Sequence, residues 1–131
     1  MTTESIVHEL FRRLDLRDPE KVAELFAAEV HWFIPGPAHR AWTGVRTRRE
    51  QIPEYFRILW ANFVDSAVEP GDMIVSGGQA AIFGRFSHTA VPTGKRFSHF
   101  FAMHLKIADG RINHLQVYDD TDAVERAFTR D

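Results

Sequence analysis

The sequence contains no cysteine. This absence excludes disulfide bonds, thiolate nucleophiles and cysteine-ligated zinc, and it argues against a small secreted domain held together by disulfides. Long apolar runs are also missing, and the first residues do not combine a basic region with an apolar stretch as a secretion signal does. We therefore expect a cytoplasmic protein that has no membrane partner.

Net charge is small, because 16 basic residues nearly balance 18 acidic ones and give a formal charge of -2. Without a basic surplus no global field attracts nucleic acid, so we expect no nucleic-acid partner. No two histidines stand at helical i, i+4 spacing with a carboxylate partner, which is the pattern that indicates a protein-bound metal. The sequence therefore predicts no metal and no other cofactor.

Aromatic residues are plentiful by contrast, with 11 Phe and 3 Trp in a chain of 131 residues. This length predicts one domain over residues 1–131 and suffices to bury a substantial core. Large rings supply much apolar surface with few rotamers, so they suit the walls of a cavity as well as a solid core.

Apolar residues at helical spacing predict four helices. Thr3 is the predicted N-cap of the first, and Asp18-Pro19 is the predicted start of the second, whose buried face is expected to include Phe26. The expected helices span about 4–16, a short segment from Pro19, about 49–63 and about 121–129.

The rest of the chain alternates like strands and breaks at glycine-rich turns. Strands are expected near 30–34, 64–75, 79–90, 96–108 and 111–119. Helices first and antiparallel strands afterwards predict an α+β fold, in which N-terminal helices pack over the concave face of a curved, mainly antiparallel sheet. Such a cone-shaped roll leaves a conical hollow between its layers.

Residues 94–120 are the most informative segment. They predict two long antiparallel strands, and the first of these places His99 on an otherwise apolar face. The second strand ends in Asp119 and Asp120. A histidine on an apolar face near two carboxylates is one way to build an acid/base site in a dry cavity. An ordinary curved sheet with a few buried polar groups has the same pattern.

The order of the elements resembles the nuclear transport factor 2-like superfamily, and within it the bacterial SnoaL-like branch. The segments LFAAEVHWFIPG, WTGVRTRREQIPEYF and GRINHLQVYDDTDAVERAF carry this resemblance, which covers nearly the whole chain. Relatives include ketosteroid isomerases, polyketide cyclases and limonene epoxide hydrolases. The resemblance implies a cone-shaped cavity for a small molecule and dimerisation through the sheet. Some members only bind ligands, so the fold leaves the function open.

The resemblance also implies candidate site residues. SnoaL-like proteins often end their last strand with Tyr-x-Asp-Thr, and here the matching segment is Tyr118-Asp119-Asp120-Thr121. By this match Asp120 takes the place of the acid that works as general acid/base in the cyclases.

Two better-known catalytic arrangements of the family are not matched. The place of the ketosteroid isomerase base is held by Phe33 or Ile34, and neither side chain can take a proton. The place of the dehydratase aspartate is held by Arg12 or Arg13. Steroid isomerisation with a base at that place is therefore not expected, and the dehydratase dyad is missing as well.

Strand alternation disagrees with the family match about the acids. Strict alternation groups Asp119 with the apolar Leu115 and Val117, and Asp120 with Tyr118. We take Asp120 as the first candidate for the inward acid and Asp119 as the second. The alternative for either residue is an N-cap of the last helix, for which Asp120 before Thr121 is well placed.

The other candidates surround these acids. His99 and Tyr118 are expected to polarise or orient a ligand oxygen, although His99 also fits a core or interface histidine. The expected aromatic lining, each member of which is also an ordinary core residue, consists of Trp42, Phe56, Trp60, Phe63, Phe83 and Phe101.

Three functions fit these features. The first is an isomerase, cyclase, dehydratase or epoxide hydrolase that acts on a small apolar organic molecule. The second is a non-catalytic module that binds such a ligand, and the third is a dimerisation module with a solid core. Phe100 and Ala102 point away from the expected core and are too apolar for a free surface, so we expect a homodimer through the sheet.

Overall fold

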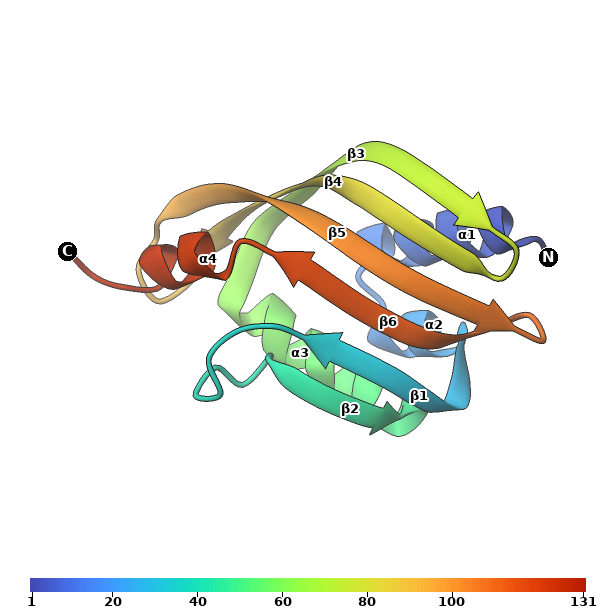
Figure 1. Cartoon of the computed structure of the whole chain (residues 1–131). Helices are drawn as coiled ribbons and strands as arrows, with labels where there is room; N and C mark the ends of the chain where they lie inside the picture. Colours follow the sequence, from blue (N-terminus) through green and yellow to red (C-terminus); the bar gives the residue numbers. More distant parts are fainter.

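A computed structural model describes all 131 residues. One six-stranded sheet, in the order β2-β1-β6-β5-β4-β3, forms the body of the molecule (Figure 1). The strands are β1 (Phe26–Ile34), β2 (Gly44–Arg48), β3 (Phe63–Ser76), β4 (Gln79–Ala90), β5 (Arg96–Ala108) and β6 (Arg111–Asp119). β1 and β6 run parallel, and all other neighbours are antiparallel.

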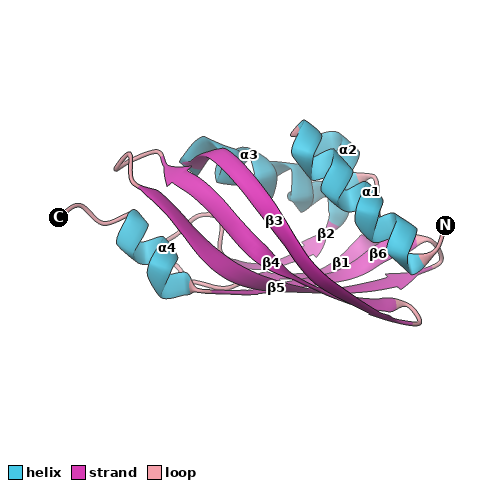
Figure 2. Cartoon of the chain, turned by 90° about the horizontal axis from the view of Figure 1, so that it is seen from above, coloured by secondary structure: helices cyan, strands magenta, loops and turns pink.

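The helices lie mainly on one side of this sheet. They are α1 (Thr3–Leu16), α2 (Pro19–Ala23), α3 (Ile52–Asn62) and α4 (Thr121–Ala127), and a single 3-10 turn over Arg49–Gln51 precedes α3. Figure 2 shows α1, α2 and α3 above the concave face of the curved sheet, with α4 at one end. The predicted α+β class, with helices over a curved and mainly antiparallel sheet, is confirmed.

The helix starts follow the expected capping chemistry with one shift. Thr2, and not Thr3, caps α1, because its side chain accepts a hydrogen bond from the Ser5 backbone N–H at 3.0 Å. Thr3 instead donates to the Gly77 carbonyl at 2.8 Å and ties α1 to the β3–β4 turn. Asp18 caps α2 as predicted. Pro53 lies in the first turn of α3, where its missing N–H costs nothing.

Two strand predictions need correction. Phe26 is fully buried in β1 and does not belong to α2, because α2 ends at Ala23 and the extended chain begins at Phe26. The strand β2 was not predicted, since it lies at the sheet edge and its side chains are mostly exposed. An edge strand of this kind lacks the apolar alternation that identifies a half-buried strand.

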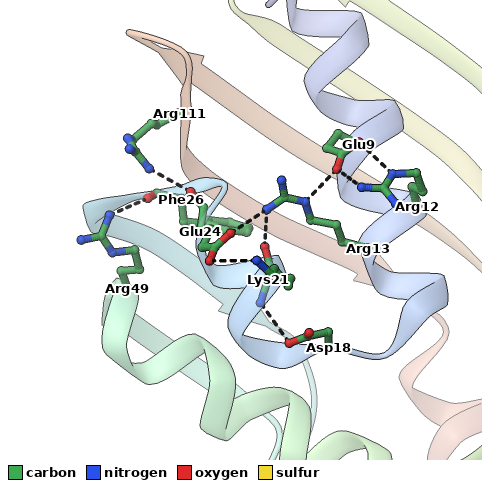
Figure 3. A network of polar contacts seen from close by, with 9 residues as sticks. All are labelled: Glu9, Arg12, Arg13, Asp18, Lys21, Glu24, Phe26, Arg49 and Arg111. Atoms are coloured by element: carbon green, nitrogen blue, oxygen red, sulfur yellow. Dashed lines mark hydrogen bonds and ion pairs between the residues drawn. The ribbon is translucent and has the colours of Figure 1, made fainter.

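An arginine network fastens α1 to the rest of the fold (Figure 3). Arg13 donates to Glu9 Oε1 at 2.8 Å and to the Lys21 carbonyl of α2 at 2.6 Å. Arg12 donates to the other oxygen of Glu9 at 2.9 Å, and the two arginines lower the pKa of Glu9 to about 2. The arginines at the position of the dehydratase aspartate therefore bind neighbouring residues of the scaffold.

The two faces of the sheet differ sharply. On the concave side Trp32, Phe101 and Leu105 are almost completely buried. On the convex side Phe100 is 74% exposed and Tyr118 is 53% exposed.

None of the helices has the length and hydrophobicity that crossing a bilayer requires.

Candidate active site

A cavity of about 610 Å³ lies between the concave face of the sheet and the helices α1 and α3. Its walls are mainly apolar, and aromatic rings contact one another around it. Trp42 packs edge-on against Phe63 at 5.0 Å between ring centres, and Phe56 stacks on Trp60 at 4.9 Å. The candidate lining residues that do line it are Trp42, Phe56, Trp60, Phe63 and Phe101.

Two candidates do not reach the cavity. Phe83 is 41% exposed, and Tyr118 is 53% exposed. Both pair with Ala102 of β5 and share its convex face, whereas their neighbours Ile82 and Val117 point inward. The prediction that Phe83 lines the cavity is therefore wrong, and Tyr118 is not placed to orient a ligand oxygen inside it.

Asp119 is the acid that faces the cavity. Alternation along β6 turns Leu115, Val117 and Asp119 to the concave side, and all three line the cavity. The Asp119 Oδ1 atom is buried and has no hydrogen-bond partner. Burial raises the pKa of Asp119, the charge of His99 opposes this effect, and the charge of Asp120 adds to it.

Asp120 is the N-cap of α4 and does not line this cavity. Its Oδ1 accepts a hydrogen bond from the Ala123 backbone N–H at 3.0 Å, and its side chain is exposed. The strand ends at Asp119, so the chain has already turned toward the helix at Asp120. The placement of Asp120 as the inward acid is corrected in favour of Asp119.

His99 lies beside Asp119 on the neighbouring strand. It is the one buried polar or charged side chain of the fold, at 6% exposure, and it lines the cavity. Its Nδ1 lies 3.3 Å from the Phe100 carbonyl oxygen. Because a carbonyl only accepts, this contact places the proton on Nδ1 and leaves the lone pair on Nε2. His99 can therefore accept a proton at Nε2.

A second polar pair in the cavity was not predicted from the sequence. His88 Nδ1 lies 2.8 Å from Ser66 Oγ, and its ring centre lies 5.9 Å from that of His99. Burial, reinforced by the positive charges of His99, Arg96 and Arg17, lowers the pKa of His88 to about 3. His88 is therefore neutral at ordinary pH. Its place on the inward face of β4, two residues after Phe86, was the available signal.

Tyr55 of α3 supplies a hydroxyl near Asp119. The side chain is buried, lines the cavity and packs against Trp32 at 4.9 Å between ring centres. Burial raises the pKa of Tyr55, and the charge of Asp119 adds to this effect. The Arg46 guanidinium, which lies 4.8 Å from the ring centre, opposes it. The phenol stays protonated and can donate a hydrogen bond. Apolar spacing identified α3 but not the inward direction of this residue.

The cavity thus combines a carboxyl group with a raised pKa, a histidine lone pair and a phenol in apolar surroundings. No group of three or more His, Asp or Glu side chains is arranged to hold a metal ion. The described groups can hold, accept or donate a proton and can bind one ligand oxygen.

The sequence profile of the SnoaL-like domain matches residues 7–115. The chain belongs to the SnoaL-like family. This match begins within α1 and ends in the middle of β6, so it includes His88 and His99 and stops before Asp119. Among curated proteins, none matches this SnoaL-like chain significantly.

Solved structures share the whole SnoaL-like fold. A nuclear transport factor 2-like protein from Burkholderia thailandensis is 24% identical, with a TM-score of 0.88 and 99% of each chain covered. A candidate isomerase from Rhodopseudomonas palustris is 26% identical, with a TM-score of 0.77, 95% of this chain and 93% of that chain covered. TerC, co-crystallised with polyporic acid, is 17% identical, with a TM-score of 0.84, and the match covers 96% of this chain and 97% of TerC.

Proposed function

We propose that this SnoaL-like protein is an enzyme that moves a proton on a small, mostly apolar organic molecule held in the cavity. The observation that carries the proposal is Asp119, a carboxyl group with a buried oxygen that has no hydrogen-bond partner and with its pKa raised by burial. A carboxyl group in such surroundings can act as acid or base near neutral pH. A resemblance to a candidate isomerase agrees with this class of chemistry.

The roles follow from the chemistry of the three groups. Asp119 takes a proton from one ligand atom and returns it to another. His99, with its Nε2 lone pair, shares the proton or bears a positive charge that stabilises the Asp119 carboxylate. Tyr55 donates a hydrogen bond to the ligand oxygen on which negative charge develops. Isomerisation, cyclisation, dehydration and epoxide hydrolysis are the reactions of this type, and none of them requires a cofactor.

A ligand-binding module is the second candidate function. The size and the apolar walls of the cavity favour it, because binding pockets for organic ligands commonly measure about 300–1,000 Å³ and are lined by aromatic side chains. In this case Asp119, His99 and Tyr55 only orient the ligand. TerC shows that a protein of this fold takes up an organic acid in its crystals.

Titration of the Asp119 carboxyl carbon by NMR tests whether Asp119 serves a site of either kind, catalytic or ligand-binding, or has only a structural role. We expect its pKa above the ordinary value of 3.8, because desolvation disfavours the carboxylate. An Asp119 that titrates at or below its ordinary value would contradict the acid/base proposal.

We also propose that the protein forms a homodimer in the cytoplasm through the convex face of the sheet. Phe83, Phe100 and Tyr118 expose apolar surface there, and Phe100 is 74% exposed. Sedimentation at micromolar concentration is expected to show a dimer, and Phe100→Asp is expected to shift it toward monomer, because a charge at the centre of an apolar contact is costly. A wild-type monomer would refute this assembly.

A further inference from the structure

A second polar cluster stands where the cavity reaches the surface. Ser66 and Arg17 are exposed although both line the cavity, and His88 lies between Ser66 and the buried His99. We propose that Arg17, His88 and Ser66 form an anion subsite that binds a carboxylate or phenolate oxygen of an otherwise apolar ligand. The inference deepens the proposed function, since it assumes that the same cavity holds the ligand.

A bulge in the sheet assembles the neutral part of this subsite. The β3–β4 register shifts between Val64 and Ala67, and Asp65 within the bulge has a φ of 51°. The extra residue turns Ser66 to the concave face, 2.8 Å from His88 Nδ1. When the Ser66 hydroxyl donates to Nδ1, the proton of the neutral ring lies on Nε2 and can be donated to a ligand oxygen.

Arg17 supplies the charge. Its guanidinium lies 5.4 Å from the centre of the Trp60 ring, and Trp60 is itself stacked on Phe56. Arg12 and His8 also line the cavity, but Arg12 pairs with Glu9, and His8 lies 3.7 Å from Glu4. Arg17 stacks on an aromatic ring instead, which leaves its N–H groups available to an anion.

The local field favours a negative group at this end. The charged groups that act on His88 are all basic, namely His99, Arg96 and Arg17. Asp15 lines the cavity from the same end of α1 but is not among the charges that act on His88. Asp119 lies at the other end, where its carboxylate repels an anion. A ligand with one acidic end is therefore oriented with its neutral end toward Asp119.

The spacing of the strands sets the length of this ligand. Ser66, His88, His99 and Asp119 belong to β3, β4, β5 and β6, which are four adjacent strands. Three strand spacings amount to roughly 14 Å along the sheet. A molecule of two linked rings with a terminal carboxylate can span most of this distance. The substrate class is therefore an elongated aromatic or alicyclic acid.

Biphenylcarboxylate and its uncharged amide test the subsite by isothermal titration calorimetry. The wild-type protein is expected to bind the carboxylate about tenfold more tightly than the amide, as one charge-assisted hydrogen bond of ordinary strength provides. Arg17→Gln is expected to abolish this preference with little change for the amide. The matched control is Arg85→Gln, which removes the same charge from the convex face, where Arg85 stacks on Phe100 and donates to Ser98.

The results separate this inference from the proposed function. Equal affinity for the two probes, a preference that survives Arg17→Gln, or no binding of either probe would overturn the subsite. Loss of the preference in Arg17→Gln and its retention in Arg85→Gln would support it. The titration of Asp119 is expected to be the same in the Arg17→Gln protein, so a failure of the acid/base proposal is detected independently.

Discussion

Asp119→Asn is expected to slow the removal of a proton from a bound carbon acid by about 100-fold or more. A positioned general base contributes about 10²–10⁴-fold to the rate of such a step. The ring opening of nitrobenzisoxazole measures this rate of proton removal, and it requires no knowledge of the natural substrate. In that reaction a base removes the carbon-bound proton, the N–O bond breaks, and a nitrile and a coloured phenolate form. The probe is flat, apolar and small enough for a cavity of about 610 Å³.

The pH dependence has a definite sign. The carboxylate is the reactive form, so the rate should rise with pH across the raised pKa of Asp119 and then level off. The midpoint is expected above 3.8, the ordinary value for aspartate. A midpoint that persists in Asp119→Asn would assign the reaction to His99.

Asp120→Asn is the matched control for this variant. It makes the same chemical change one residue away, and asparagine caps a helix about as well as aspartate does. We expect its rate to stay within about threefold of the wild type, which is small beside the general-base contribution. Equal losses in both variants, or a larger loss in Asp120→Asn, would contradict the assignment of Asp119.

The stability of Asp119→Asn shows whether a lost rate reflects lost folding. A folded-state pKa above the unfolded value means that the protonated form stabilises the fold, and this contribution disappears as pH rises through the folded pKa. At neutral pH the neutral asparagine is therefore expected to make the variant at least as stable as the wild type in urea unfolding. The difference should vanish below pH 3.8, where aspartate is neutral in both states.

Between pH 7 and pH 4 the wild type is expected to lose about 3 kcal/mol of stability because of His88, and His88→Gln is expected to avoid this loss. The pKa of His88 falls from 6.5 to about 3 on folding, mainly because burial disfavours the charged ring. Below pH 6.5 the unfolded chain therefore binds a proton that the folded protein does not. The contribution of neutral His88 to the stability is fully present above pH 6.5 and decreases as the pH falls toward about 3.

Urea unfolding at pH 7, pH 5.5 and pH 4 measures this effect. Glutamine is neutral at every pH, so the variant should show a flatter dependence even if lost contacts with Phe63 and Phe97 lower its stability at pH 7. His8→Gln, at a side chain of α1 that is 69% exposed, controls for the loss of one histidine from the unfolded chain. Curves of equal slope for His88→Gln and the wild type would show that His88 is not held neutral by burial.

Short-range patterns in the sequence predicted most of the fold. Apolar stripes identified α1, α3 and α4, and alternation identified the strands β4 to β6 close to their observed ends. The edge strand β3 is mostly exposed, and the glycine-rich turn that follows it identified it instead. These signals depend on neighbouring residues only, because a helix or strand must bury one side whatever it packs against. The edge strand β2 has no fully buried residue, so apolar alternation could not find it.

Strand alternation and the family pattern gave different predictions for the candidate site. Alternation alone placed Asp119 with Leu115 and Val117, as observed, whereas the family pattern favoured Asp120. The pattern failed because it aligns residue types, and the side to which a side chain points at the end of a strand depends on where the helix begins. His99 required only its strand, since five inward neighbours on β5 defined the buried face.

The sequence by itself determined the α+β architecture, the inward placement of His99 and the alternation that turns Asp119 inward. Only the tertiary structure decided that Tyr55 of α3 lies near Asp119 of β6 and that Ser66 binds His88. Both contacts join residues from different elements, and the second also requires a bulge that shifts the register. Local propensity cannot report such contacts, because they depend on how the helices sit on the sheet and on cross-strand register.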